Sequence, residues 1–171
     1  MPKYSYYEND LKEMSREDIA TLCASLASID QTDEFEDTLL LAACKNKQID
    51  LIEHFLSLGA DPNFLNSCGD TPLHVLIDTV AHDEEASLHG IEILLNAGAD
   101  IEIIGYMGKT PFLRACSRDS LLALKLLVQH GCNTSATLSE HGRELDALFF
   151  ANTFNLKAEL INYIKSVTVH N

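Results

Sequence analysis

Residues 69–100 begin with GDTPLHVLIDTV and end with GIEILLNAGAD, and this stretch carries the signals for two helices joined in one unit. Thr71 is placed to cap a helix, and Pro72 occupies the first helical position, where a backbone N–H group is not needed. The apolar residues of 90–95 follow helical spacing, and Gly98 comes next, as is typical of a glycine that ends a helix with a positive φ. Two helices this short are not stable alone, so the unit predicts packing against neighbours of the same kind.

The same signals recur elsewhere in the chain. Gly-Asp-Thr-Pro-Leu-His at 69–74 has a counterpart in Gly-Lys-Thr-Pro-Phe-Leu at 108–113. Gly-Ala-Asp at 98–100 has a counterpart at 59–61. Self-similarity of this kind is the signature of a repeat architecture.

The spacing of three threonines defines the period. Thr38 precedes Thr71 by 33 residues, whereas Thr71 precedes Thr110 by 39 residues. A period of 33 residues with an insertion of six explains both distances. We place this insertion between the two helices of the middle unit, around 81–87.

The pattern of a turn glycine, T-P-L-H, a second apolar helix and G-A-D resembles the ankyrin repeat, over roughly residues 33–164. The resemblance implies an all-α solenoid of helix-turn-helix units with short hairpin turns and a capping helix at each end. The first unit departs from the pattern because Glu36 occupies the place of the turn glycine. The last unit departs further, with Arg143 and Glu144 in place of Thr-Pro, so it is interpreted as a C-terminal cap.

We expect one domain built of five segments. They are an N-terminal tail and capping helix (1–32), ankyrin repeats one (33–65), two (66–103, with the insertion) and three (104–136), and a degenerate C-terminal capping repeat (137–171). In the first segment, Ser15 and Asp18 predict a capping box, and Ile19 and Leu22 follow at helical spacing. Residues 1–10 are expected to be poorly ordered.

The charge of the chain indicates what kind of partner to expect. The 171 residues include 26 Asp and Glu against 12 Lys and Arg, a formal net charge of −14. This excess disfavours binding to nucleic acid and to anionic membranes, and it favours a protein partner with a basic surface. Residues 1–37 hold ten acids against three basic residues, so the N-terminal end is the most acidic. The alternative interpretation is that the charge only keeps the protein soluble.

The sequence also bears on location. The N-terminal MPKYSYYENDLKEM has no apolar run typical of a secretory signal, and no window is apolar enough to predict a membrane span. The five cysteines of the chain are scattered and include no CxxC pair. We therefore expect reduced thiols in a cytoplasmic protein, with non-classical delivery into a host cell left open.

Three groups of residues could suggest chemistry. His82 and His89, with three acids between them, could be a metal site, but a solvated acidic loop is the favoured interpretation. Cys44 and Cys116 fall where the ankyrin family has a small packed residue, which implies inert buried thiols. His74 is the histidine of T-P-L-H, which in that family is a structural hydrogen-bonding residue. No catalytic residue, metal or cofactor is predicted.

The resemblance implies binding through the hairpin tips and the exposed face of the first helices. The candidate residues at these positions are Phe35, Asp37, Lys45, Asn46, Cys68, Asp70, Asp78, Tyr106, Met107, Lys109 and Arg118, and the acids Asp83, Glu84 and Glu85 of the insertion form a second candidate point. Phe35, Tyr106 and Met107 stand out, because an apolar side chain on a turn has no evident folding role. The alternative is that each tip packs onto its neighbour.

These observations predict a non-catalytic, monomeric protein that binds or inhibits a basic protein partner in a stoichiometric complex. An immunity protein that neutralises a toxin would be one example. An alternative is a secreted effector that acts as an adaptor in a host cell. A further alternative is a metal-dependent enzyme that uses the 82–89 loop, which the sequence does not favour.

Overall fold

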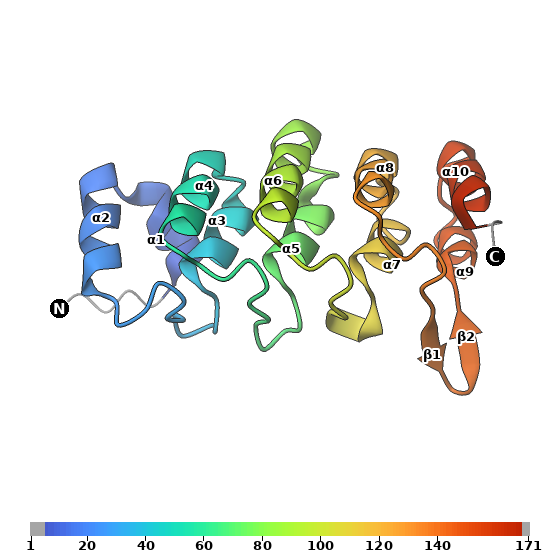
Figure 1. Ribbon diagram of the computed structural model, residues 1–171, viewed down its shortest axis with the longest axis horizontal. Coiled ribbons are helices and arrows are strands. Elements are labelled where there is room, and N and C mark those ends of the chain that lie inside the picture. Colours follow the sequence, from blue (N-terminus) through green and yellow to red (C-terminus); the bar gives the residue numbers. More distant parts are fainter. Residues whose placement is uncertain (1–5, 169–171) are drawn as a thin grey trace.

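The computed structural model describes residues 6–168, and these form an elongated stack of helix pairs (Figure 1). In chain order the elements are α1 (Tyr7–Glu13), α2 (Arg16–Ser25), α3 (Leu39–Asn46), α4 (Ile49–Ser57), α5 (Pro72–Thr79), α6 (Glu84–Asn96), the 3-10 turn η1 (Tyr106–Gly108), α7 (Pro111–Ala115), α8 (Leu121–Gln129), β1 (Leu138–Glu140), β2 (Arg143–Leu145), α9 (Ala147–Thr153) and α10 (Ala158–Thr168). The second helices α2, α4, α6, α8 and α10 form one row, and the hairpin turns project from the opposite side of the stack (Figure 1). The predicted all-α solenoid is confirmed.

The helix starts follow from local sequence. The hydroxyls of Thr38, Thr71 and Thr110 each accept a hydrogen bond from the backbone N–H three residues later, so the predicted cap at Thr71 is confirmed and its two counterparts in the period are caps as well. Two residues before its cap, each hairpin has a residue in the left-handed region. Gly69 has φ +80° and Gly108 has φ +71°, and in the first unit Glu36 adopts φ +62°. The missing glycine is thus replaced by a strained glutamate, at a cost of about 1 kcal/mol.

The core lies between successive helix pairs. Residues 39–44 of α3 are all fully buried, because α3 packs against α1, α4 and α5 together. Phe55, Leu76 and Phe112 are also fully buried, one in each of the three repeats. Burial of one such side chain stabilises the fold by about 1.5–3 kcal/mol, so the stacking of neighbouring pairs supplies the stability that the single helices lack.

The prediction of a poorly ordered N-terminus is wrong for residues 6–10, and residues 1–5 lie outside the described part. Residues 7–13 form the helix α1, in which Tyr7 and Leu11 are 2% exposed. Asn46 Nδ2 donates to the backbone oxygen of Glu8 at 2.7 Å, which ties α1 to α3. Tyr7 and Leu11 lie four residues apart, as on one face of a helix, but the rest of this segment is polar. Their spacing predicts a buried helix face only once α3 is known to cover it. The capping box of Ser15 and Asp18 at the start of α2 is confirmed.

From Glu84 onward the insertion is helix and not loop. The helix α6 has 13 residues, against nine in both α4 and α8, and it begins at Glu84, six residues before the predicted start at Gly90. The Asp83 carboxylate caps this helix by accepting from the backbone N–H of Ala86 at 3.2 Å. Glu84 and Glu85 lie in its first turn, where the helix dipole stabilises negative charge. The acids that suggested a solvated loop are therefore a helix start.

The last repeat also differs from its prediction. Residues 143–145 form the strand β2, paired with β1 in antiparallel register Ser139↔Glu144, so Arg143 and Glu144 do not begin a helix. The helix α9 begins at Ala147, three residues after Glu144. The Asp146 carboxylate caps it by accepting from the N–H of Phe149 at 2.7 Å. An aspartate is a strong cap, so the helix starts at this residue and the hairpin before it is longer.

Candidate functional site

Apolar side chains are exposed on the hairpin loops. Phe35 is 58% exposed, Tyr106 53% and Met107 62%. Leu65 and Ile104, six residues before the caps Thr71 and Thr110, are exposed as well and were missed in the sequence. Their repeated offset from the cap was the signal that could have found them. We call Phe35, Leu65, Ile104, Tyr106 and Met107 the hairpin patch.

Part of this patch is packed against its neighbour. The ring of Phe35 lies 4.7 Å from the ring of Tyr6, between centroids, so the segment before α1 covers one side of Phe35. Tyr106 approaches the guanidinium of Arg114, whose central carbon lies 5.8 Å from the ring centroid. Each aromatic ring is therefore held in place on one side and open to solvent on the other.

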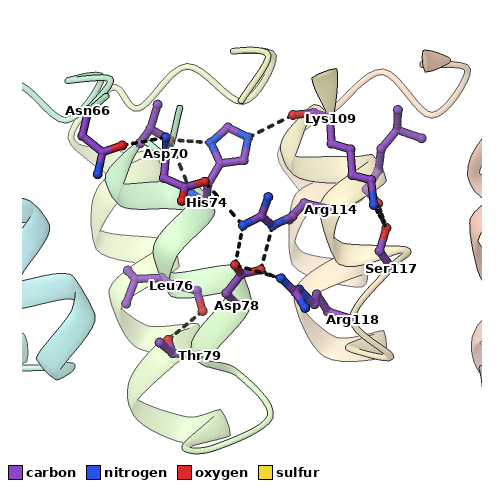
Figure 2. Close-up of polar contacts among 12 residues, drawn as sticks. Asn66, Asp70, His74, Leu76, Asp78, Thr79, Lys109, Arg114, Ser117 and Arg118 are labelled. Carbon is purple, nitrogen blue, oxygen red and sulfur yellow. Dashed lines mark hydrogen bonds and ion pairs between the residues drawn. The ribbon is translucent and has the colours of Figure 1, made fainter. Parts of the chain in front are cut away.

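A buried histidine holds two neighbouring hairpins together (Figure 2). His74 Nε2 lies 3.2 Å from the backbone oxygen of Lys109, and His74 Nδ1 lies 2.8 Å from Thr71 Oγ1. Because a carbonyl only accepts, Nε2 carries the proton and Nδ1 accepts from the threonine hydroxyl. Burial lowers the pKa of His74, which keeps the ring neutral in this arrangement. At Gly105 an added Cβ would lie 2.7 Å from this ring, so the approach of the third repeat's hairpin requires glycine.

An acidic side chain of α5 binds two arginines of the next repeat (Figure 2). Asp78 Oδ1 accepts from Arg114 Nε at 2.8 Å and from Arg118 Nε at 2.8 Å, and Asp78 Oδ2 accepts from both guanidinium groups as well. Burial alone would raise the pKa of Asp78, but the hydrogen bonds from the two arginines outweigh it and the pKa is lowered. Asp78 and Arg118 were predicted to bind a partner. The buried Arg114 was not predicted to have a role, because the equivalent position of the preceding repeat is the apolar Val75.

Two residues predicted to face outward are buried. Asp37 is 1% exposed, forms an ion pair with Lys45, and accepts from Asn66 Nδ2 at 2.9 Å. Lys109 is 7% exposed, and its Nζ donates to Ser117 Oγ at 2.9 Å. The position directly before the helix cap is buried in both of these repeats, which the sequence pattern does not reveal.

The remaining candidates lie on two different sides of the stack of helix pairs. Asp70 is half-buried, and burial raises its pKa, while Cys68 at the same hairpin tip is exposed. Asp83, Glu84 and Glu85 are exposed, but they follow the C-terminus of α5, whereas the hairpins precede the N-termini of the first helices. The structure therefore does not bring the acidic point of the insertion together with the hairpin patch.

Burial also changes the charge count at the N-terminal end. Asp33 accepts hydrogen bonds from the backbone N–H groups of Tyr7, Phe35 and Asp37, at 2.8, 2.9 and 3.1 Å. Asp33 and Asp37 thus serve the fold and add little to the outer surface. Glu13, Glu17, Asp18, Glu34 and Glu36 remain exposed there.

The groups considered for chemistry are placed as follows. Across residues 6–168, His, Cys, Asp and Glu side chains form no group of three or more that could hold a metal ion. Cys44 and Cys116 are fully buried, and burial raises the pKa of both thiols, which suits packing and not nucleophilic attack. None of the helices between residues 6 and 168 has the length and apolar character needed to cross a membrane.

Comparisons with known proteins agree with this geometry. A family model described as ankyrin repeats (3 copies) matches residues 13–104 and 39–140. Human transient receptor potential cation channel subfamily A member 1 is 26% identical over 75% of this chain, and chicken NF-kappa-B inhibitor alpha is 32% identical over 58%. An ankyrin repeat protein of fowlpox virus is 28% identical over 78% of this chain. The aligned regions span only 11%, 31% and 38% of these relatives.

Proposed function

Since the chain belongs to the ankyrin-repeat family, we propose that it is a non-catalytic module that covers a protein partner in a stoichiometric complex. The observation that carries this proposal is the hairpin patch, in which five large apolar side chains lie exposed on neighbouring hairpins. Exposed apolar groups gathered on one edge mark interaction sites more often than isolated ones do. Aromatic side chains with one face fixed are also efficient anchors, since little rotamer freedom is lost on binding.

The hairpins that carry the patch are tied to one another. Asn66 links the second hairpin to Asp37 of the first, and His74 links the second repeat to the backbone of Lys109 in the third. A rigid row of hairpins supports tight binding because the surface is already arranged before the partner arrives. This rigidity favours a binder over a scaffold that rearranges around its partner.

The charge of the chain suggests the finer role. An exposed acidic end and a net charge of −14 support a partner with a basic surface, and the relative named NF-kappa-B inhibitor alpha is an inhibitor by its name. We propose inhibition by a cytoplasmic monomer, of the kind an immunity protein exerts on a toxin. The fowlpox virus relative favours the second candidate, an adaptor delivered into a host cell.

Truncation of two adjacent exposed residues at the tip of the third hairpin tests the interface. Tyr106→Ala combined with Met107→Ala is expected to weaken partner binding by more than about 2 kcal/mol, because both exposed side chains would be desolvated in the complex. The partner is first isolated by pull-down from the native source with mass spectrometry, and its affinity is then measured by isothermal titration calorimetry.

The matched control is Leu122→Ala, which removes an apolar side chain that is 42% exposed on α8, in the row of second helices. We expect it to leave the affinity unchanged. Circular dichroism establishes that both variants are folded. An unchanged affinity in the Tyr106 and Met107 variant would mean that the hairpin patch is not the interface.

The basic character of the partner predicts a salt effect. Raising the ionic strength from low to physiological values shortens the Debye length to about 8 Å, so the affinity should fall. Glu13→Gln with Glu17→Gln removes two exposed acids of the N-terminal end and should reduce the association rate by at least about twofold at low salt. Association rates from surface plasmon resonance that respond neither to salt nor to this variant contradict a basic partner.

A further inference from the structure

Two positions on the first helices change their chemistry from one repeat to the next. The first position directly precedes the helix cap, and the second lies eight residues later, near the end of the helix. In repeats one and three the two side chains are joined by a hydrogen bond. In repeats one to three these pairs are Asp37 and Lys45, Asp70 and Asp78, and Lys109 and Ser117. The first repeat therefore pairs an acid with a base, the second carries two acids, and the third carries a base without an acid.

The two acids of the second repeat form ion pairs with arginines of the third repeat. Arg114 Nη2 lies 3.4 Å from Asp70 Oδ1, and Arg114 Nε lies 2.8 Å from Asp78 Oδ1. Arg118 also binds Asp78 through two hydrogen bonds. Both carboxylates are thus committed to arginines, and neither is left to pair with Lys109.

Lys109 holds a buried ammonium group without a carboxylate of its own. In the stretch from residue 6 to residue 168, no carboxylate oxygen lies within the 4.0 Å of an ion pair from its Nζ. Ser117 Oγ accepts from Nζ while its own hydroxyl donates to the backbone oxygen of Leu113 at 2.8 Å. The other neighbours are aromatic: Nζ lies 4.4 Å from the ring centroid of Phe150 and 5.4 Å from that of Phe154.

The surroundings make this positive charge costly. Burial lowers the pKa of Lys109, and the positive charges of Arg114 and Arg118 lower it further. Three cations (Lys109, Arg114 and Arg118) share this cluster with the two carboxylates Asp70 and Asp78. In a chain with a net charge of −14, this cluster is therefore locally positive by one charge.

The cluster borders the exposed surface. The side chain of Arg118 is 49% exposed, and Phe154, which lies over the Lys109 ammonium, is 52% exposed. Tyr106 of the hairpin patch lies against Arg114 of the same cluster. The cluster therefore reaches the surface at Arg118, and two exposed aromatic rings contact its cationic groups.

We propose that this cluster is an anion-binding subsite within the partner interface, which receives an aspartate or glutamate side chain of the partner. Its carboxylate pairs with the Lys109 ammonium and the Arg118 guanidinium, and the adjoining partner residues pack on Phe154 and Tyr106. The proposal rests on the proposed function, because it takes the hairpin patch as the interface. It adds that the partner, although basic overall, presents an acidic residue to the third repeat.

Peptides selected for binding test the subsite. A random displayed peptide library is selected on the full-length protein, and bound peptides are then synthesised with each acid and with its amide counterpart. We expect peptides that require Tyr106 and Met107 to share an Asp or Glu whose replacement by Asn or Gln weakens binding at least about tenfold in fluorescence anisotropy. With Lys109→Met, the acid and amide forms should bind within about twofold of one another.

Two further variants separate charge from fold. Lys109→Arg retains a cation and should retain the preference for the acid. Lys125→Met removes a lysine from α8, in the row of second helices, and should leave the preference unchanged. Thermal unfolding checks that Lys109→Met is folded, which we expect because it removes an unpaired buried charge.

The outcomes distinguish the two proposals. Peptides that show no enrichment in Asp or Glu overturn the subsite, as does an acid preference that survives in Lys109→Met. If the selected peptides bind the Tyr106→Ala and Met107→Ala variant as tightly as the unmodified protein, the hairpin patch itself fails, and the proposed interface fails with it.

Discussion

Asp78→Ala is expected to destabilise the fold by about 3–5 kcal/mol, the loss typical when one partner of a buried ion pair is removed. Asp78 receives hydrogen bonds from both Arg114 and Arg118, and the Arg114 side chain is only 7% exposed. Without Asp78, the Arg114 guanidinium would keep only Asp70, at 3.4 Å. Urea unfolding followed by circular dichroism measures the change in the free energy of unfolding.

Matched variants isolate the buried charge as the cause. Arg118→Ala breaks a half-exposed pair with the same aspartate and should cost about 1 kcal/mol or less. Asp78→Leu combined with Arg114→Met removes both partners and leaves no buried guanidinium unpaired, so most of the loss should be recovered. A cost below about 1 kcal/mol for Asp78→Ala would show that Asp70 or water compensates for the missing carboxylate.

The same residue predicts a pH effect. The pKa of Asp78 is lower in the folded protein than the usual aspartate value of about 3.9. A group of this kind stabilises the fold at neutral pH, and the stabilisation is lost as the pH falls through the unfolded and then the folded pKa. The stability of Asp78→Ala, measured by urea unfolding between neutral and acidic pH, should therefore decrease less on acidification than that of the unmodified protein.

Phe112→Ala is expected to cost about 3–5 kcal/mol, because a fully buried ring is replaced by a cavity. The effect should be near the upper end, since Phe112 is the largest apolar side chain of α7, a helix of only five residues that are all buried. The loss should also reach beyond one repeat, because α7 packs against α5, α8 and α9. Thermal unfolding should show a decrease in Tm on the order of 10 °C.

Phe35→Ala is the control, since it makes the same chemical change at a hairpin tip where the ring is 58% exposed. It should cost about 0.5 kcal/mol or somewhat more, because only the contact with Tyr6 is lost. Equal losses for the two variants would mean that the ring of Phe112 is not a packing centre of the stack.

The sequence by itself determined the helices of the repeats and the family. Thr71 caps a helix as predicted, and so do its counterparts Thr38 and Thr110, because a cap is made by a hydroxyl and a backbone N–H only three residues apart. Gly59 and Gly98 adopt the positive φ expected of residues that end a helix. Such interactions are local, so the order of residues is enough to specify them.

The tertiary structure alone decided which polar residues serve the fold. Asp37 was predicted to face a partner, yet it is buried and binds Lys45 and Asn66, and Arg114 carries an ion pair where the preceding repeat has Val75. The partner of each charge lies in another helix or another repeat, as Arg114 and Asp78 illustrate across 36 residues. Burial and charge pairing depend on the distances between elements packed together, and those distances exist only once the repeats have stacked.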